Sequence, residues 1–208
     1  MQLNEMWETH IKKSGADFVR FVDISSLPED IVGDYTCAVL FGKALTREYL
    51  QAIKDGIKPA RREFGNTERR MDALADRLSE KLTSEGYRSI AKLKFARLPH
   101  KTVARMAGFG FIGKNTLLVS EEYGCAAVLG KVLTTAPFIS VHAQPKETQC
   151  GDCYICVDAC PTKALTGSPW GITTRREEML VRKLCIPCLM CAVSCPYTKK
   201  YMEGEAAS

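Results

Sequence analysis

The 208-residue sequence lacks any stretch close to the roughly 18 uninterrupted apolar residues that a membrane-spanning helix requires. Its first ten residues contain acidic side chains and no apolar core, so we expect no signal peptide, no membrane partner and a cytoplasmic location. Glycine and proline are not enriched, with 15 and 9 residues, while 46% of the residues are hydrophobic. This composition excludes collagen-like, low-complexity and disordered classes, and is typical of a globular protein.

Basic side chains exceed acidic ones by 29 to 24, and the formal net charge is +5. The surplus is local, because residues 58–105 carry 13 basic and 6 acidic side chains, whereas residues 1–57 carry 6 and 9. This basic segment has two interpretations. It could contact a phosphate-bearing partner, or it could be the solvated face of a helix.

Apolar residues recur at two different periods over the first 140 residues. Helical spacing, N-caps and terminating glycines predict helices over the ranges 3–13, 46–54, 67–85 and 100–107. Short apolar or alternating runs predict strands over the ranges 17–24, 37–41, 88–95, 116–119 and 125–133. This alternation of strands and helices predicts an α/β or α+β domain.

The composition of the chain changes near residue 145. Beyond this point the sequence has eight cysteines, several prolines and glycines, and few long apolar runs. We therefore expect two domains, a cofactor-binding α/β domain over residues 1–145 and a small cysteine-rich domain over residues 146–208.

Cysteine is the residue that this sequence has in excess, with ten copies, and eight of them form two repeats of C-x-x-C-x-x-C-x-x-x-C-P. The repeats are Cys150, Cys153, Cys156 and Cys160, followed by Cys185, Cys188, Cys191 and Cys195. Three cysteines at this spacing can wrap one loop around a cubane, so that each thiolate binds a different iron. In two-cluster ferredoxins the fourth cysteine of each repeat binds the other cluster.

This exchange of fourth ligands predicts two [4Fe–4S] clusters. The first cysteine group is Cys150, Cys153, Cys156 and Cys195, and the second is Cys185, Cys188, Cys191 and Cys160. Zinc is an alternative, although it prefers two separated C-x-x-C pairs, and a disulfide framework is another. Cys37 and Cys125 lie outside the repeats in apolar runs, where we expect buried and inert thiols.

The segment from Gly108 to Thr116, called the glycine loop below, imitates two nucleotide-binding motifs. It matches G-x-G-x-x-G and also, except for Asn115 in place of Ser or Thr, the P-loop pattern G-x-x-x-x-G-K. Both motifs need a strand before the loop and a helix after it, whereas the order predicted here is the reverse. We therefore reject both motifs. The loop either brings its backbone close to another ligand or is a purely structural turn.

Together with the cysteine repeats, the segment from His100 to Leu118 resembles the epoxyqueuosine reductase family, which is in turn similar to the reductive dehalogenases. The similarity covers approximately residues 85–200. It implies a nitroreductase-like α/β domain that holds a cobalamin against a bacterial-ferredoxin-like domain with two clusters. It also implies that the low-potential clusters reduce the cobalt, and that the substrate is epoxyqueuosine in a tRNA anticodon loop.

The resemblance further implies that the glycine loop lines the cofactor. The residues expected to do so are Gly108, Gly110, Gly113, Lys114, Asn115 and Thr116. His100 and Lys101 precede this loop and are candidate catalytic residues, because histidine titrates near neutral pH. His100 could equally satisfy local hydrogen bonds in the first turn of its helix.

Three features depart from the family pattern. Lys94 stands where the family has an acidic residue that is thought to donate a proton. The long C-terminal extension with helical repeats, which the family uses for tRNA, is missing from this sequence, so we expect a short form. The second cysteine repeat is also more compact than in the family. These departures affect the tRNA substrate more than the cofactor chemistry.

Three functions are compatible with these residues. The first is an iron–sulfur and corrinoid-dependent reductase of a small or nucleoside-like substrate, which takes electrons from a low-potential donor. The second is an electron-transfer protein that reduces a partner, such as the corrinoid centre of another protein. The third is a flavin-binding reductase, because the nitroreductase-like fold is associated with FMN.

Overall fold

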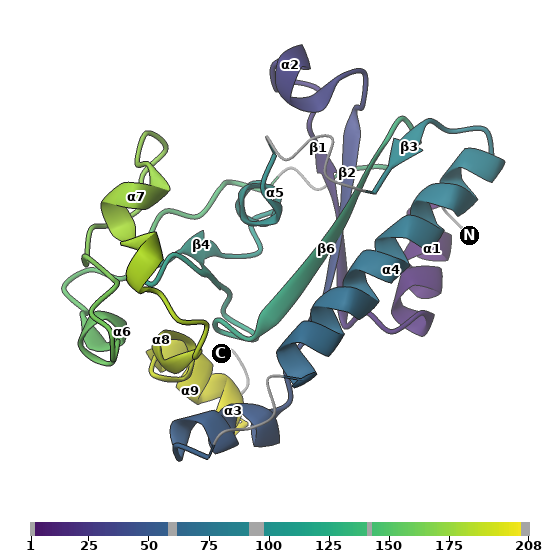
Figure 1. The fold of residues 1–208 in the computed structure, drawn as a ribbon. Coiled ribbons are helices and arrows are strands. Elements are labelled where there is room, and N and C mark those ends of the chain that lie inside the picture. The colour runs from purple at the N-terminus through teal and green to yellow at the C-terminus, as the bar shows by residue number, and fades with distance from the viewer. Residues whose placement is uncertain (1–2, 58–61, 92–97, 141–142, 205–208) are drawn as a thin grey trace. The chain divides into compact units, whose positions relative to one another are not determined.

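The computed structural model describes residues 3–57, 62–91, 98–140 and 143–204. These residues form a mixed α/β structure that divides into two compact units (Figure 1). Unit 1 consists of Met1–Ala44, Phe64–Ala107 and Val128–Gln144. Unit 2 consists of Leu45–Glu63, Gly108–Ala127 and Pro145–Ser208. Within the described ranges, no helix is both long and apolar enough to cross a membrane.

Unit 1 contains a four-stranded sheet in the order β1-β2-β6-β3. Its strands are β1 (Phe18–Asp23), β2 (Cys37–Ala44), β6 (Ala127–Thr134) and β3 (Ser89–Ile90). The antiparallel pairing of β1 with β2 places Phe21 opposite Val39, and both side chains are buried. All four strands overlap ranges predicted from the sequence, because short apolar runs of this kind bury well in a sheet.

Helices cover this sheet on both sides (Figure 1). They are α1 (Leu3–Lys13), α4 (Arg62–Ser84) and α5 (His100–Met106), while the short α2 (Glu29–Val32) lies beyond the ends of β1 and β2. The face of α4 that was predicted to be apolar is buried, at Met71, Leu74, Leu78 and Leu82. Helix α4 begins five residues before the predicted start at residue 67. Its first turns are polar and glycine-containing, so they carry no apolar period that sequence analysis could detect.

Unit 2 joins the cysteine repeats to two segments that lie far from them in the sequence. Its helices are α3 (Arg47–Lys54), α6 (Ile155–Asp158), α7 (Arg176–Met179), α8 (Met190–Val193) and α9 (Pro196–Glu203), with a 3₁₀ turn at Arg182–Leu184. Helix α3 contacts both α8 and α9. The Tyr201 hydroxyl donates a hydrogen bond of 2.9 Å to the Leu45 carbonyl. Thr46 caps α3 as predicted, because its hydroxyl accepts from the Tyr49 N–H.

The chain passes from unit 1 to unit 2 at residue 145, where the sequence predicts a domain boundary. It also crosses between the units at residues 45, 64, 108 and 128. The division into domains 1–145 and 146–208 stays a prediction. Lys94 and the second half of the strand predicted over residues 88–95 lie outside the described residues.

Candidate functional site

The cysteines of unit 2 gather into two groups. Burial, together with the neighbouring thiolates of Cys195, Cys150 and Cys153, raises the pKa of Cys156 to about 11. Burial and the nearby Cys188, Cys156, Cys160 and Cys185 raise the pKa of Cys191 to about 12. Cys195 lines the same cavity as Cys150, Cys153 and Cys156 and so lies with the first repeat, whereas Cys160 shares a hydrophobic cluster with Cys185 and Cys191 of the second. This is the arrangement that an exchange of fourth ligands requires, whereas iron ligation itself stays a prediction.

The first cysteine group lines a cavity of about 190 Å³. Its walls include all four thiols of the group, the rings of Phe111 and Tyr197, and Gly113. In the described part of the chain, no three His, Cys, Asp or Glu side chains lie close enough to hold one metal ion. A single zinc ion would need sulfurs within roughly 4 Å of one another. A cubane instead binds each thiolate to a different iron, and the four thiols around this cavity fit such a cluster, whereas the choice between a cluster and zinc stays a prediction.

Hydrogen bonds favour the thiolate form of both exchanged cysteines. At Cys195 the pKa falls to about 7, because the Cys125 thiol donates to it, although burial acts in the opposite direction. The N–H groups of Tyr197 and Thr198 and the Thr198 hydroxyl also donate to Cys195. At Cys160 burial raises the pKa, but the N–H of Ala164, at 3.3 Å from the sulfur, and the Thr162 hydroxyl lower it overall. Both thiols therefore lose their protons more readily, and the thiolate is the form that binds metal.

The glycine loop directs its polar side chains at the two cysteine repeats. The side chain of Lys114 is only 4% exposed, and its ammonium donates to the carbonyls of Gly151 (2.7 Å) and Cys153 (3.2 Å). This ammonium also lies 3.7 Å from the centre of the Tyr154 ring, at cation–π distance. Lys114 therefore binds the loop of the first repeat through two backbone carbonyls and an aromatic ring.

Asn115 makes the corresponding contacts with the second repeat and with Cys125. Its amide nitrogen donates to the Cys191 carbonyl at 3.4 Å and to the Cys125 sulfur at 3.2 Å. Its side-chain oxygen accepts from the Leu117 N–H. The residue that departs from the P-loop pattern is therefore one that joins the glycine loop to the cysteine repeats.

The order of elements around the glycine loop agrees with the sequence analysis. Helix α5 precedes the loop, and the antiparallel pair β4 (Phe111–Ile112) and β5 (Leu118–Val119) lies within and after it. A Cβ added to Gly110 would lie 2.3 Å from the Val119 carbonyl oxygen, so the hairpin leaves no room for a side chain there. Thr116 has a φ of 63°, a left-handed conformation that residues other than glycine rarely adopt. The cofactor contacts expected of Gly108, Gly113 and their neighbours stay a prediction.

Cys125 lies just before β6, not inside the strand that the sequence predicts, and it contacts the first cysteine group. Its role as an inert thiol stays a prediction. Its N–H donates to the Thr198 hydroxyl at 2.9 Å. The hydrogen bond to Cys195, aided by burial, raises the pKa of Cys125 well above its usual range, so Cys125 keeps its proton. Cys37 is buried in β2, and burial raises its pKa to about 11, in keeping with an inert thiol.

The two catalytic candidates lie at the start of α5 in unit 1. Burial, together with the charge of Lys131, lowers the pKa of His100 to about 4. Lys131 is itself 7% exposed, and burial lowers its pKa as well. His100 is therefore neutral near pH 7 and suits accepting a hydrogen bond better than donating a proton. Lys101 is not without interaction partners, and its catalytic role stays a prediction.

We expect the depressed pKa of His100 to make the protein less stable in acid. The unfolded chain binds a proton near pH 6.5, whereas the folded protein resists it until about pH 4, so stability present above pH 6.5 is lost as pH falls. When the pH falls from 7.5 to 5, the free energy of unfolding should decrease by about 1–2 kcal/mol more in wild type than in His100→Gln. Urea unfolding of the anaerobic protein at the two pH values measures this difference. The exposed His10→Gln variant should behave like wild type, and equal losses in all three proteins would contradict this prediction.

Comparisons with known proteins agree with the resemblance seen in the sequence. No family model matches the chain. The chain is 34% identical over 145 residues to the epoxyqueuosine reductase of Lactococcus garvieae, which spans 63% of this chain and 40% of that protein. It is 38% identical over 96 residues to the Bacillus subtilis enzyme, spanning 46% and 24%. The matched region thus covers less than half the length of these relatives.

Solved structures resemble the fold. A crystal structure of selenomethionine-labelled epoxyqueuosine reductase aligns over 99% of this chain and 69% of its own, with a TM-score of 0.62 and 22% identity. The reductive dehalogenase NpRdhA aligns over 74% of this chain and 25% of its own, with a TM-score of 0.57 and 18% identity. Fold and sequence therefore agree, and the chain is similar to the epoxyqueuosine reductases in both.

Proposed function

We propose that the chain is an iron–sulfur oxidoreductase whose two [4Fe–4S] clusters pass low-potential electrons to a cobalamin, for reduction of a substrate still to be identified. The observation that carries this proposal is the gathering of Cys195 with the thiols of the first repeat around one cavity, and of Cys160 with Cys185 and Cys191 of the second in one cluster. Two clusters that share a small unit lie close enough for electrons to pass between them. Such clusters exchange single electrons at potentials set by their surroundings.

The residues of this chain would each have a defined part. The first and second cysteine groups would hold the irons, and the N–H groups near Cys160 and Cys195 would offset the charge on the sulfurs. Lys114 and Asn115 would keep the two cysteine loops in place against the glycine loop. The apolar rings of Phe111 and Tyr197 would exclude water from the first cluster.

The cobalamin part of the proposal depends on the family resemblance. A corrinoid would supply a reduced cobalt that can attack or reduce a substrate. Of the loop residues expected to line it, Lys114 and Asn115 direct their polar atoms at the cysteine repeats instead.

The contacts of Lys114 and Asn115 with the cysteine repeats favour a second candidate, an electron-transfer protein that reduces the corrinoid centre of a partner. A glycine loop whose polar side chains bind the cysteine repeats does not need to bind a further cofactor. Lys94 also stands where the family has an acidic proton donor, which would matter less in a protein without substrate chemistry. A flavin-binding reductase is the third candidate.

Cofactor analysis separates these candidates. We expect the anaerobically purified and iron-reconstituted protein to contain about eight irons per chain, because each cubane holds four. Titration with cobalamin should change its absorbance spectrum, and cofactor extraction should yield corrinoid rather than FMN. Iron without cobalamin binding would favour the electron-transfer protein, extracted flavin would favour the third candidate, and the absence of iron would overturn the proposal.

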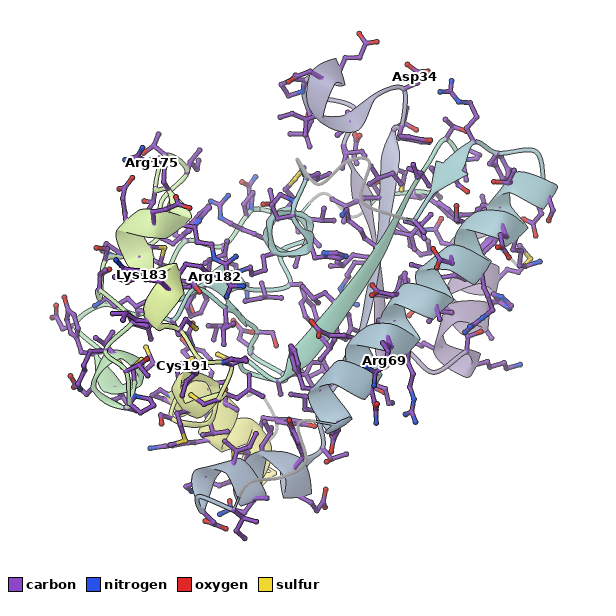
Figure 2. All side chains as sticks on the ribbon, viewed as in Figure 1. Asp34, Arg69, Arg175, Arg182, Lys183 and Cys191 are labelled. Carbon is purple, nitrogen blue, oxygen red and sulfur yellow. The ribbon has the colours of Figure 1, made fainter. Side chains whose placement is uncertain are left out.

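A nucleic-acid partner can be tested in the same preparation. One solved epoxyqueuosine reductase of similar fold contains an epoxyqueuosine-modified tRNA stem loop. In this chain the basic segment includes α4, where Arg69 lies on the helix surface (Figure 2) and Lys81 forms an ion pair with Glu85. We propose that the partner is a small molecule or a corrinoid protein, so we expect no binding of a tRNA stem loop at physiological salt. Binding that persists at this salt concentration would instead favour tRNA as the partner.

A further inference from the structure

The two faces of the unit 1 sheet carry different side chains. Side chains alternate along a strand, and residues paired across two strands point to the same face. Ser89 pairs with Thr134, and the Ser89 hydroxyl donates to the Ser79 carbonyl of α4 at 2.6 Å. Thr134 therefore faces α4. Lys131, three residues earlier on β6, points to the opposite face, which α5 covers (Figure 1).

Arg20 lies on the same face of the sheet as Lys131. A Cβ added to Gly130 would lie 2.5 Å from the Phe41 ring, so Phe41 of β2 shares the face of α4. Leu40, its neighbour in β2, therefore points to the face of Lys131. Arg20 of β1 pairs with Leu40, and the strand order β1-β2-β6 places Leu40 between the two cations. One face of the sheet thus carries two positive side chains.

Carboxylates do not balance this charge. Among the described residues of the four strands and of α5, Asp23 is the one acidic side chain, and its pairing with Cys37 places it on the α4 face. Lys131 is only 7% exposed, and in the described part of the chain its ammonium has no hydrogen-bond or ion-pair partner. A buried ammonium without partners is costly, because it has lost its hydration. A ligand that supplies negative charge would remove this cost.

The nitrogen of Lys131 is open to such a ligand. In the described ranges, the polar side-chain atoms that are fully enclosed without a partner are Trp7 Nε1 and Thr148 Oγ1, so the Lys131 nitrogen is not enclosed. His100, at the start of α5, lies near enough for the charge of Lys131 to act on it. A neutral imidazole still has one N–H to donate. An anion that reaches this face would therefore meet an ammonium and an imidazole together.

We propose that Lys131 and His100, with the charge of Arg20 on the same face, bind the phosphate group of a small ligand on the α5 face of unit 1. A phosphate monoester suits these groups, because its three terminal oxygens can accept from the ammonium and the imidazole at once. Arg20 donates to the Val19 carbonyl at 2.8 Å and contributes its charge. This inference goes beyond the proposed function, since it concerns unit 1 and does not depend on the clusters of unit 2.

The test is a calorimetric titration of the anaerobic, iron-reconstituted protein with inorganic phosphate at physiological chloride concentration. We expect wild type to bind one phosphate per chain, and Lys131→Met, which removes the charge, to bind it about tenfold more weakly or worse. Lys131→Arg keeps the charge and should keep most of the affinity. Lys12→Met should bind like wild type, because Lys12 is exposed on α1 and pairs with Glu8. Acetate should not bind.

Stability distinguishes a ligand-binding lysine from a structural one. Without phosphate, Lys131→Met should unfold at a urea concentration no lower than wild type, because the substitution removes a buried charge that has no partner. Phosphate should raise the unfolding midpoint of wild type and leave that of Lys131→Met unchanged. Unfolding of the variant at a lower urea concentration would show that Lys131 supports the fold, and would overturn the inference.

Three binding results would also overturn it. They are no phosphate binding by wild type, equal affinity in wild type and Lys131→Met, and binding of acetate as tight as that of phosphate. None of them affects the proposed function, because the iron content of the same samples reports on the clusters of unit 2. Binding of FMN that is tighter than that of inorganic phosphate and is lost in Lys131→Met would support the inference and identify the ligand as a flavin.

Discussion

Cys195→Ala is expected to lower the iron content from about eight to about four atoms per chain, and Cys160→Ala to do the same through loss of the other cluster. The reason is that each cysteine lies with the repeat to which it does not belong in sequence. Breaking one ligand leaves three thiolates of the same loop, which hold a cubane poorly. Iron analysis and the visible spectrum measure this directly, and Cys37→Ala, outside both groups, should retain all the iron.

Double variants distinguish exchanged ligands from local ones. If the ligands are exchanged, Cys150→Ala combined with Cys195→Ala damages one cluster twice, and about four irons should remain. Cys185→Ala combined with Cys195→Ala then damages both clusters, and almost no iron should remain. If each repeat held its own cluster, these two results would be interchanged. That interchange would contradict the grouping of thiols on which the proposed function rests.

Gly124→Ala should strongly destabilise the protein. Gly124 has a φ of +54°, and a Cβ added to it would lie 2.4 Å from both the Cα and the backbone nitrogen of Thr198. Left-handed strain and a clash with backbone that cannot move aside should together cost about 3–5 kcal/mol of unfolding free energy. Because Thr198 and Cys125 flank Cys195, the variant should also bind iron less tightly.

Two other glycines serve as matched controls for Gly124. Gly86 has a φ of +91° with no atom within 4 Å of the added Cβ, so Gly86→Ala isolates the backbone strain and should cost about 1–2 kcal/mol. Gly65 lies inside α4 and faces only the end of the Arg69 side chain, so Gly65→Ala should stabilise by about 0.5–1 kcal/mol. Urea unfolding under anaerobic conditions measures all three. A cost for Gly124→Ala no larger than that for Gly86→Ala would contradict the predicted clash.

Much of the fold could be predicted because its signals are local. The buried stripe of α4, the cap of α3 by Thr46 and the reversed order of elements around the glycine loop all follow from residues within a few positions of one another. A helical period, a cap or a glycine turn acts over one or two turns of chain, so it is visible in the sequence itself. These signals indicated a mixed α/β structure.

Contacts between distant segments could not be predicted in the same way. Nothing local to Cys125 indicates that it meets Cys195, and its apolar neighbours favoured a strand instead. In sequence, the glycine loop with Lys114 and Asn115 resembles a phosphate-binding loop. In the structure, these two side chains instead bind carbonyls of the cysteine repeats. Helix α3 was expected in the first domain, but it packs against α8 and α9.

The sequence by itself determined the two cysteine repeats and their spacing, since the number of residues between thiols limits which loops can surround one cluster. Only the tertiary structure decided what surrounds each group: the buried Lys114, the thiol of Cys125 and the hairpin that closes over Gly110. The physical reason is that spacing along a chain is a covalent constraint, whereas burial and hydrogen-bond partners depend on which distant segments pack together.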